Sequence, residues 1–193
     1  IRGEMEECPI FAYTASKAAS GKSKLAEMVG IVAIGEDAPT MSFNHRPEET
    51  QKTLEAALMA GVKVATFDNV ATELDFDHPF INQVVTSAQV TIRQLGLHKH
   101  VVCSTRVLLQ ATGNNLSITG DIVSRTQRIK IAPAEEYPED RKFDFDPVRV
   151  VRKHRGIGAV SLGLGLDGAG VADRDLQGGV GNRLVGNGVV DED

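Results

Sequence analysis

The sequence contains few cysteines, no tryptophan and no long apolar run. Cys8 and Cys103 are the only cysteines among its 193 residues. Two cysteines are too few for a disulfide framework, or for a four-ligand zinc site without several histidines at fixed spacing. A reducing compartment fits this composition, and we expect the cytoplasm. No stretch of about 18 consecutive apolar residues occurs, so no membrane-spanning helix and no membrane partner are expected.

A strong charge of one sign is also missing. The formal net charge of −5 gives no bulk attraction for nucleic acid, so any contact with DNA needs a local basic patch. Acidic residues at Glu4, Glu6 and Glu7 interrupt the first eight residues, so a secretory signal is not expected. The first residue is not Met, and we expect a start that is truncated at its N-terminus.

Apolar strands alternate with helical patterns along most of the chain. Pro47 followed by Glu48 and Glu49 is typical of a helix start, and Gly35 and Gly61 are typical of helix ends. The expected helices are at 22–34, 47–60, 80–86 and 121–125, and the expected strands are at 9–13, 62–67, 90–92, 107–111 and 128–132. This alternation predicts an α/β fold, a three-layer sandwich with a mostly parallel sheet.

Glycine is concentrated at the C-terminal end. The 38 residues from Gly156 to Asp193 hold 11 of the 19 glycines and no aromatic residue or proline. Such a segment loses much conformational entropy on ordering and buries little. We therefore expect a core at 1–155 and a disordered or aberrant tail at 156–193.

A phosphate-binding motif follows the first strand. Gly21, Lys22 and Ser23 match the end of GxxxxGK[ST], in which the lysine reaches the β and γ phosphates and the hydroxyl reaches Mg²⁺. The first glycine of that pattern is Ser16 here, which narrows the choice of backbone angles. The residues expected to bind ATP are Ser16, Ser20, Gly21, Lys22, Ser23 and Lys24. The alternative is an ordinary helix start with Ser20 as N-cap and a solvated Lys22.

Two further strand ends carry polar residues. Asp68 ends the strand VKVATF, 46 residues after Lys22, where a carboxylate can hold Mg²⁺ together with Ser23. Asn69 follows at the place where many AAA+ ATPases carry a glutamate that activates the attacking water. An amide cannot accept a proton from that water as a carboxylate does. Asn114 lies another 46 residues on and could orient the attacking water. Each could instead form only a turn, which Asp, Asn and Gly favour.

Together, GKS, Asp68-Asn69, ATGNN at 111–115 and GDIVSRTQRIKI resemble the ATPase domains of phage and prophage primase-helicase proteins. These belong to the broader AAA+ and superfamily 3 helicase-like group of P-loop ATPases. The resemblance spans about Pro9 to Arg155. It implies a hexameric ring with ATP and Mg²⁺ at subunit interfaces and single-stranded DNA in the central pore. It also implies Asn114 as a sensor and Arg125, with Arg128 in reserve, as an arginine finger donated by the neighbouring subunit.

Other interpretations remain open from the sequence. Asn69 fits a weakly hydrolysing, ATP-gated loader or assembly module, and a P-loop with a Mg²⁺-binding aspartate also fits a small-molecule kinase. The chain could also be a fragment that binds nucleotide poorly. His98 and His100 are expected in a solvated loop rather than at a metal. The cluster Arg149, Arg152, Lys153, His154 and Arg155 could follow a DNA backbone, form a solvated helix face or serve as a helix C-terminus.

Overall fold

A five-stranded parallel sheet lies at the centre of the computed structural model, which describes residues 8–94, 99–133 and 145–161. The strand order is β2-β3-β7-β1-β9, and every pairing in this sheet is parallel. The strands are β1 (Ile10–Ala15), β2 (Thr40–Met41), β3 (Val64–Val70), β7 (Leu108–Asn114) and β9 (Thr126–Lys130). The α/β class and the parallel sheet expected from the sequence are confirmed.

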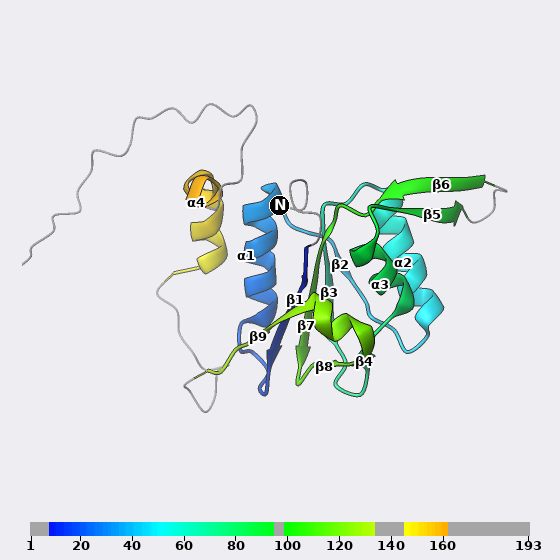
Figure 1. The fold of residues 1–193 in the computed structure, drawn as a ribbon. Coiled ribbons are helices and arrows are strands. Elements are labelled where there is room, and N and C mark those ends of the chain that lie inside the picture. The colour runs from blue at the N-terminus through cyan, green and yellow to red at the C-terminus, as the bar shows by residue number, and fades with distance from the viewer. Residues whose placement is uncertain (1–7, 95–98, 134–144, 162–193) are drawn as a thin grey trace, which may run out of the picture.

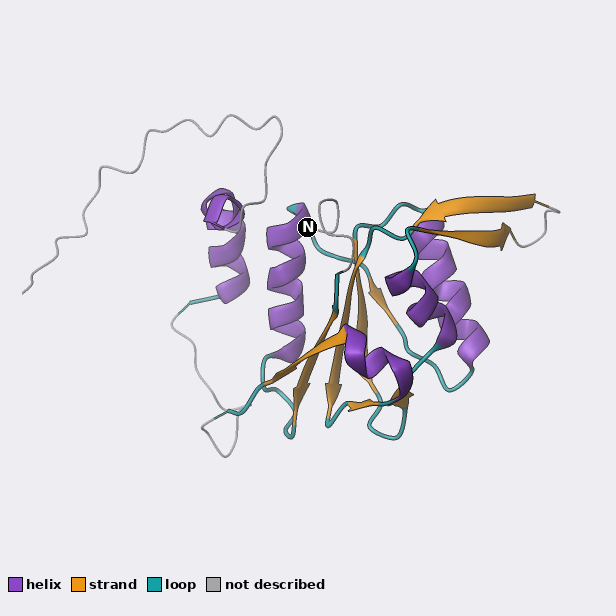
Figure 2. Cartoon of the chain, in the orientation of Figure 1, coloured by secondary structure: helices purple, strands orange, loops and turns teal. Residues whose placement is uncertain are grey.

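Helices cover both faces of this sheet, as Figures 1 and 2 show. α1 and α4 lie on one face, whereas α2 and α3 lie on the other. The helices are α1 (Lys22–Ile34), α2 (Pro47–Met59), α3 (Pro79–Thr86), the 3₁₀ helix η1 (Gly120–Arg125) and α4 (Pro147–Ser161). β4 (Asp75–Phe76) pairs with β8 (Ser117–Ile118), and β5 (Gln89–Gln94) pairs with β6 (Lys99–Ser104).

The alternation of side chains along each strand divides the core between the two faces. Val64 and Leu108 belong to a small cluster with Val29 of α1, whereas the next residues, Ala65 and Leu109, belong to the large cluster. Successive side chains of a strand point to opposite faces of the sheet, so neighbouring residues fall into different clusters. The large cluster is completed by α2 and α3, through Leu54, Leu58, Ile81, Val84 and Val85.

The helix boundaries follow the local signals in the sequence. α1 starts after Gly21, which has a φ of 93°, and ends before Gly35, whose φ is 86° and whose N–H donates to the Ile31 carbonyl at 2.8 Å. α2 starts at Pro47 with Glu48 and Glu49 in its first turn, where carboxylates interact favourably with the positive end of the helix dipole. The starts expected for α1 and α2 are confirmed.

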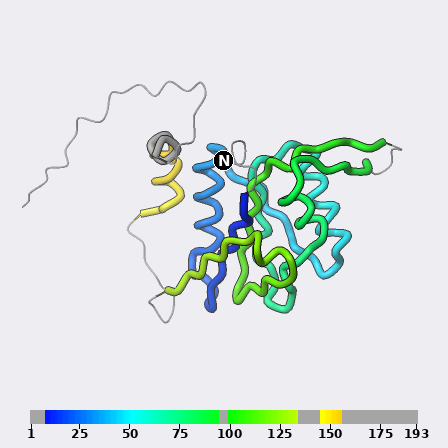
Figure 3. The backbone as a smooth tube through the Cα atoms, in the orientation of Figure 1, coloured from blue at the N-terminus to red at the C-terminus, as the bar shows by residue number. Residues whose placement is uncertain are grey.

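The strands β2, β4, β6 and β8 were not expected from the sequence. The region expected to be a solvated loop contains β6, which includes His100, while His98 lies outside the described residues. β5 and β6 form a ribbon that projects from the sheet (Figure 3). Five of the six β6 residues are exposed, all but Cys103, so this strand lacks the alternation by which strands are recognised.

α4 continues past Arg155, where we expected the core to end. It reaches Ser161, because each added residue of an existing helix gains one hydrogen bond at little nucleation cost. Residues 162–193 lie outside the described residues, and the disordered tail stays a prediction. In the part of the chain that the structure describes, no helix is long and apolar enough to cross a membrane.

Candidate functional site

The loop between β1 and α1 is shaped by two residues with positive φ. Ala19 has a φ of 51° and Gly21 a φ of 93°, whereas Ser16 is not in this left-handed region. Glycine favours such angles because it has no Cβ. The serine at the first glycine position of the motif is therefore compatible with the loop as it folds here.

Lys22 is buried at the start of α1. Its side chain is 9% exposed, and its Nζ donates to the Lys17 carbonyl at 3.2 Å, to Ser20 Oγ at 2.9 Å and to Asn114 Oδ1 at 2.8 Å. Burial lowers the pKa of Lys22 below its usual 10.5, and the nearby Asp68 carboxylate opposes this shift more weakly. The interpretation as a solvated lysine at an ordinary helix start is therefore wrong.

Ser20 does not cap this helix. The N-cap is Gly21, and no side chain of the N-cap residue closes the first turn. Ser20 is instead buried and accepts from Lys22. The free N–H groups of the first turn of α1 therefore have no serine cap, and free amides at a helix N-terminus bind anions.

Asp68 is held by two hydroxyl groups at the end of β3. Ser23 Oγ donates to Asp68 Oδ1 at 2.8 Å, and Thr112 Oγ1 donates to the same oxygen at 2.7 Å. A hydroxyl and a carboxylate this close are hard oxygen donors of the kind that bind Mg²⁺ together with substrate phosphates. The two residues fit the expected magnesium site.

Thr112 is a member of this cluster that the sequence did not single out as a site residue. It donates to Asp68, and its Oγ1 accepts from the backbone N–H of Asn69 at 2.9 Å. It lies within β7 and is 1% exposed. A hydroxyl within a buried strand was the available signal, because a buried polar group needs a partner.

Asn69 occupies an irregular position in β3. Its φ is 54°, and the pairing of β3 with β7 shifts register between Phe67 and Val70. A bulge of this kind redirects a side chain, and Asn69 is exposed beside the half-buried Asp68. Asparagine tolerates the left-handed region better than most residues. The sequence predicted the place of Asn69 but not this backbone conformation.

Strand order brings Asn114 between the two other parts of the site. β7 lies between β1 and β3, so the end of β7 is next to both the Lys22 loop and the Asp68 strand. Asn114 accepts from Lys22 at its side chain, and its backbone carbonyl accepts from Thr72 Oγ1 at 3.0 Å. Lys22, Ser23, Asp68 and Asn114, separated widely in the sequence, therefore form one cluster at the carboxyl ends of three adjacent strands.

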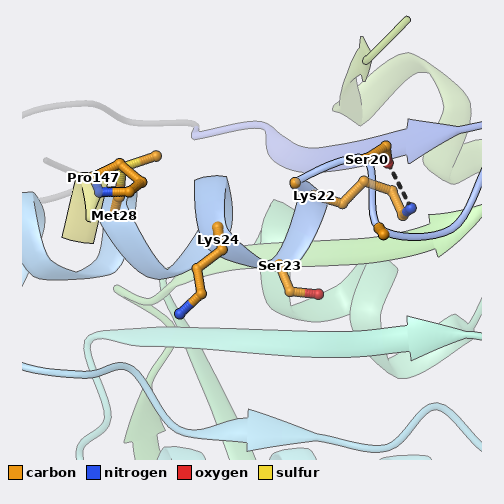
Figure 4. A pocket seen from close by; sticks show the side chains of 8 residues that line it. Ser20, Lys22, Ser23, Lys24, Met28 and Pro147 are labelled. Atoms are coloured by element: carbon orange, nitrogen blue, oxygen red, sulfur yellow. Dashed lines mark hydrogen bonds between the residues drawn. The ribbon is translucent and has the colours of Figure 1, made fainter. Parts of the chain in front are cut away.

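Two pockets adjoin this cluster. The first has a volume of about 440 Å³ and is shown in Figure 4; it is lined by Ala19, Ser20, Gly21, Lys22, Ser23, Lys24, Met28 and Pro147. The second, of about 280 Å³, includes Ser23 and Asp68 together with Glu27 and Thr66. Ser23 lines both pockets, so its hydroxyl lies between the loop of the first pocket and the Asp68 carboxylate of the second.

The two arginines expected to act in trans lie outside the cluster. Arg125 of η1 donates to the Asp121 carbonyl at 2.8 Å. Arg128 is exposed on β9, an edge strand, where it is paired in register with Ala12. Among the described contacts, neither side chain touches Lys22 or Asp68. Their role as fingers stays a prediction that depends on a second subunit.

Part of the basic cluster near the C-terminus is engaged within the chain. Arg155 Nε donates to the Ile31 carbonyl at 3.0 Å, and Arg152 pairs with Asp37. These contacts join α4 to the C-terminal end of α1, where a cation is favoured by the helix dipole. Arg152 and Arg155 therefore contact other parts of the chain, and a DNA contact of the cluster stays a prediction.

No protein-family model matches the sequence, and no curated protein is significantly similar to it. Within the described residues, no group of three or more His, Cys, Asp or Glu side chains is placed to hold a metal ion. A magnesium site completed by phosphate oxygens needs only one or two protein oxygens. The interpretation of the site therefore depends on its own geometry.

Proposed function

We propose that this chain is an ATP-binding, Mg²⁺-dependent ATPase module of the P-loop, AAA+-like kind. The observation that supports it is the convergence of Lys22, Ser23, Asp68 and Asn114 at one edge of a parallel sheet. Ligands of open α/β sheets bind at the carboxyl ends of the strands. The residue types at this edge are those that bind phosphate and magnesium.

Each residue has a distinct part in the proposed reaction. The amides around Gly21 and the Lys22 ammonium bind the β and γ phosphates. Ser23 and Asp68 would hold a magnesium ion, and the chemistry that such an ion supplies is neutralisation of the phosphate charge. Asn114 orients the attacking water through its amide, and Arg125 or Arg128 of a neighbouring subunit would stabilise the charge that develops.

The ring and the DNA partner rest on the resemblance to phage and prophage primase-helicase ATPases. A feature of the fold agrees with such a role: the β5–β6 ribbon projects from the core and carries exposed residues that include Lys99 and His100. Basic side chains on a projecting ribbon can contact a phosphate backbone. We propose a helicase-like motor on single-stranded DNA, belonging to a mobile-element replication protein.

A second function is favoured by Asn69. This residue lies beside Asp68 with its side chain exposed at the edge of the site, and an amide cannot take a proton from the attacking water. ATP would then be hydrolysed slowly and would serve to hold an oligomer together. The chain would act as an ATP-gated loader or assembly module.

ATP turnover distinguishes these possibilities. The purified protein is assayed with Mg²⁺, with and without single-stranded DNA, and its mass is followed by light scattering. Lys22→Ala removes the phosphate-binding ammonium, while Lys63→Ala removes an exposed lysine before β3 as the matched control. DNA-stimulated turnover that only Lys22→Ala abolishes supports the motor. Binding and assembly without turnover support the ATP-gated module, and no ATP binding by the unaltered protein rejects both.

A further inference from the structure

The larger pocket extends beyond the residues that phosphates require. At one end lie Ser20 and Lys22 of the loop, and at the other lie Met28 of α1 and Pro147 of α4 (Figure 4). Met28 is half-buried and Pro147 is half-buried as well. A thioether and a pyrrolidine ring bind no phosphate, so this end of the pocket suits an apolar group.

The geometry of α1 relates the two ends. Met28 follows Lys24 by four residues, so it lies about 6 Å further along the helix on the same side. The same pocket includes Lys24 of the first turn of α1, so a triphosphate bound at this helix N-terminus has room to place its α phosphate on the side of that turn. A nucleoside attached to that phosphate can then continue along the helix toward Met28.

Pro147 is fixed in position by the docking of α4. Asp146 caps this helix by accepting from the Val148 N–H at 2.9 Å, and Val148 is 6% exposed. At the other end of the contact, Arg155 binds the last turn of α1 through the Ile31 carbonyl. The wall of the pocket that Pro147 forms is therefore held by a cap, a buried valine and a charge-assisted hydrogen bond.

We propose that the nucleoside of the bound nucleotide lies between α1 and α4, with the face of its base against Met28 and Pro147. This inference rests on the proposed function of the site. Methionine sulfur makes favourable contacts with aromatic rings, and burial of the base against both side chains adds apolar area. α4 is then part of the nucleotide site, and Arg155 is a positioning residue for it.

The test compares a ligand that has a base with one that lacks it. Dissociation constants are measured by titration calorimetry for Mg²⁺-ATP and for Mg²⁺-tripolyphosphate. Met28→Ala is expected to weaken ATP binding about tenfold, the effect of one aromatic contact and two lost methylene-sized groups. Tripolyphosphate binding is expected to change less than about twofold, because the loop that holds phosphates is unaltered. Met59→Ala, an exposed methionine at the end of α2, is the matched control.

A second variant tests the positioning of α4 without touching the pocket. Arg155→Ala is expected to weaken ATP binding and to leave tripolyphosphate binding unchanged, whereas Lys153→Ala on the exposed side of α4 should change neither. ATP binding that is undiminished in both Met28→Ala and Arg155→Ala overturns the nucleoside subsite alone. Equal loss for both ligands in either variant also overturns it, since the loop itself is then affected. If the unaltered protein binds neither ligand, the proposed function is rejected and this inference with it.

Discussion

The Nζ atom of Lys22 lies 2.8 Å from Oδ1 of Asn114. This contact joins the loop after β1 to the end of β7, 92 residues further along the chain. In the free protein it replaces part of the solvation that the buried ammonium has lost. A phosphate that binds Lys22 competes with Asn114 for the ammonium, and the amide is then available next to the terminal phosphate.

Asn114→Ala should therefore reduce the rate of hydrolysis more than it reduces the affinity for ATP. If the amide orients water in the transition state, kcat falls about 100-fold, the effect of losing one well-placed polar group. The Michaelis constant changes little, since Lys22 and the loop amides still bind the phosphates. Steady-state ATPase assays measure both constants. Asn115→Gly is the control, because Asn115 has a φ of 45° that glycine adopts freely. Equal turnover in Asn114→Ala and in that control would contradict the sensor role.

Asn69→Asp should raise turnover if the missing carboxylate limits hydrolysis. Aspartate is nearly the same size, and like asparagine it tolerates the left-handed conformation of this position. A glutamate there would add backbone strain of about 1 kcal/mol. We expect kcat to rise by about tenfold or more, at the lower end of the effects of general bases. Single-turnover kinetics would show the change, and a rate equal to that of Asn69→Ala would exclude a catalytic carboxylate at this site.

ATP affinity should decrease at alkaline pH. Burial, opposed by Asp68, lowers the pKa of Lys22 below 10.5, and phosphate binding requires the charged ammonium. Affinity therefore falls as pH rises through this lowered pKa, and binding takes up a proton in that range. The stability of the protein without ATP depends on pH in the opposite direction. The unfolded chain holds the Lys22 proton more tightly than the folded chain does, so the free energy of unfolding rises with pH between the lowered pKa and 10.5.

Titration calorimetry in buffers with different ionisation enthalpies measures both the affinity and the proton uptake. Lys22→Arg is the control, since a guanidinium keeps its charge throughout this range. It should bind ATP more weakly than lysine does, because its planar group differs in shape, but without the alkaline decrease. An unaltered protein whose ATP affinity stays constant up to the usual lysine pKa would contradict the prediction.

Gly113→Ala should destabilise the protein. A Cβ at this position would lie 2.8 Å from the Val70 carbonyl oxygen, where the pairing of β3 with β7 resumes after the bulge. The strands must separate locally, at a cost of about 1–3 kcal/mol in the free energy of unfolding, and Asn114 moves with them. Urea denaturation measures the loss. Gly61→Asn serves as comparison, because a Cβ at Gly61 meets no atom within 4 Å and asparagine tolerates the φ of 72° at this position; a similar loss there would point to a general glycine effect.

The sequence predicted elements whose signals are local. Gly21 before α1 and Pro47 before α2 act within a few residues of their own position, so the starts of these helices could be read directly. The α/β class followed from the alternation of helices and apolar strands. The candidate site residues Lys22, Asp68 and Asn114 were predicted to lie together because each follows an apolar strand, where parallel strands present their carboxyl ends.

Features that depend on register or on distant packing could not be read in this way. Thr112 became a partner of Asp68 through the alignment of β7 with β3, which no local pattern encodes. β6 was missed because most of its residues are exposed, so buried and exposed positions do not alternate along it. The C-terminal end of α4 was placed too early, since glycine composition disfavours a helix whereas an existing helix is extended at little nucleation cost.

The burial of Lys22 has a practical consequence for work with the purified protein. If the loop binds phosphate as proposed, the ammonium beside the neutral oxygens of Lys17, Ser20 and Asn114 also binds small oxyanions, because sulfate and inorganic phosphate share the chemistry of a nucleotide phosphate. Protein prepared with ammonium sulfate or phosphate buffer would carry such an anion in its loop. Its melting temperature would be raised and its apparent affinity for ATP lowered, so chloride buffers are the appropriate reference state.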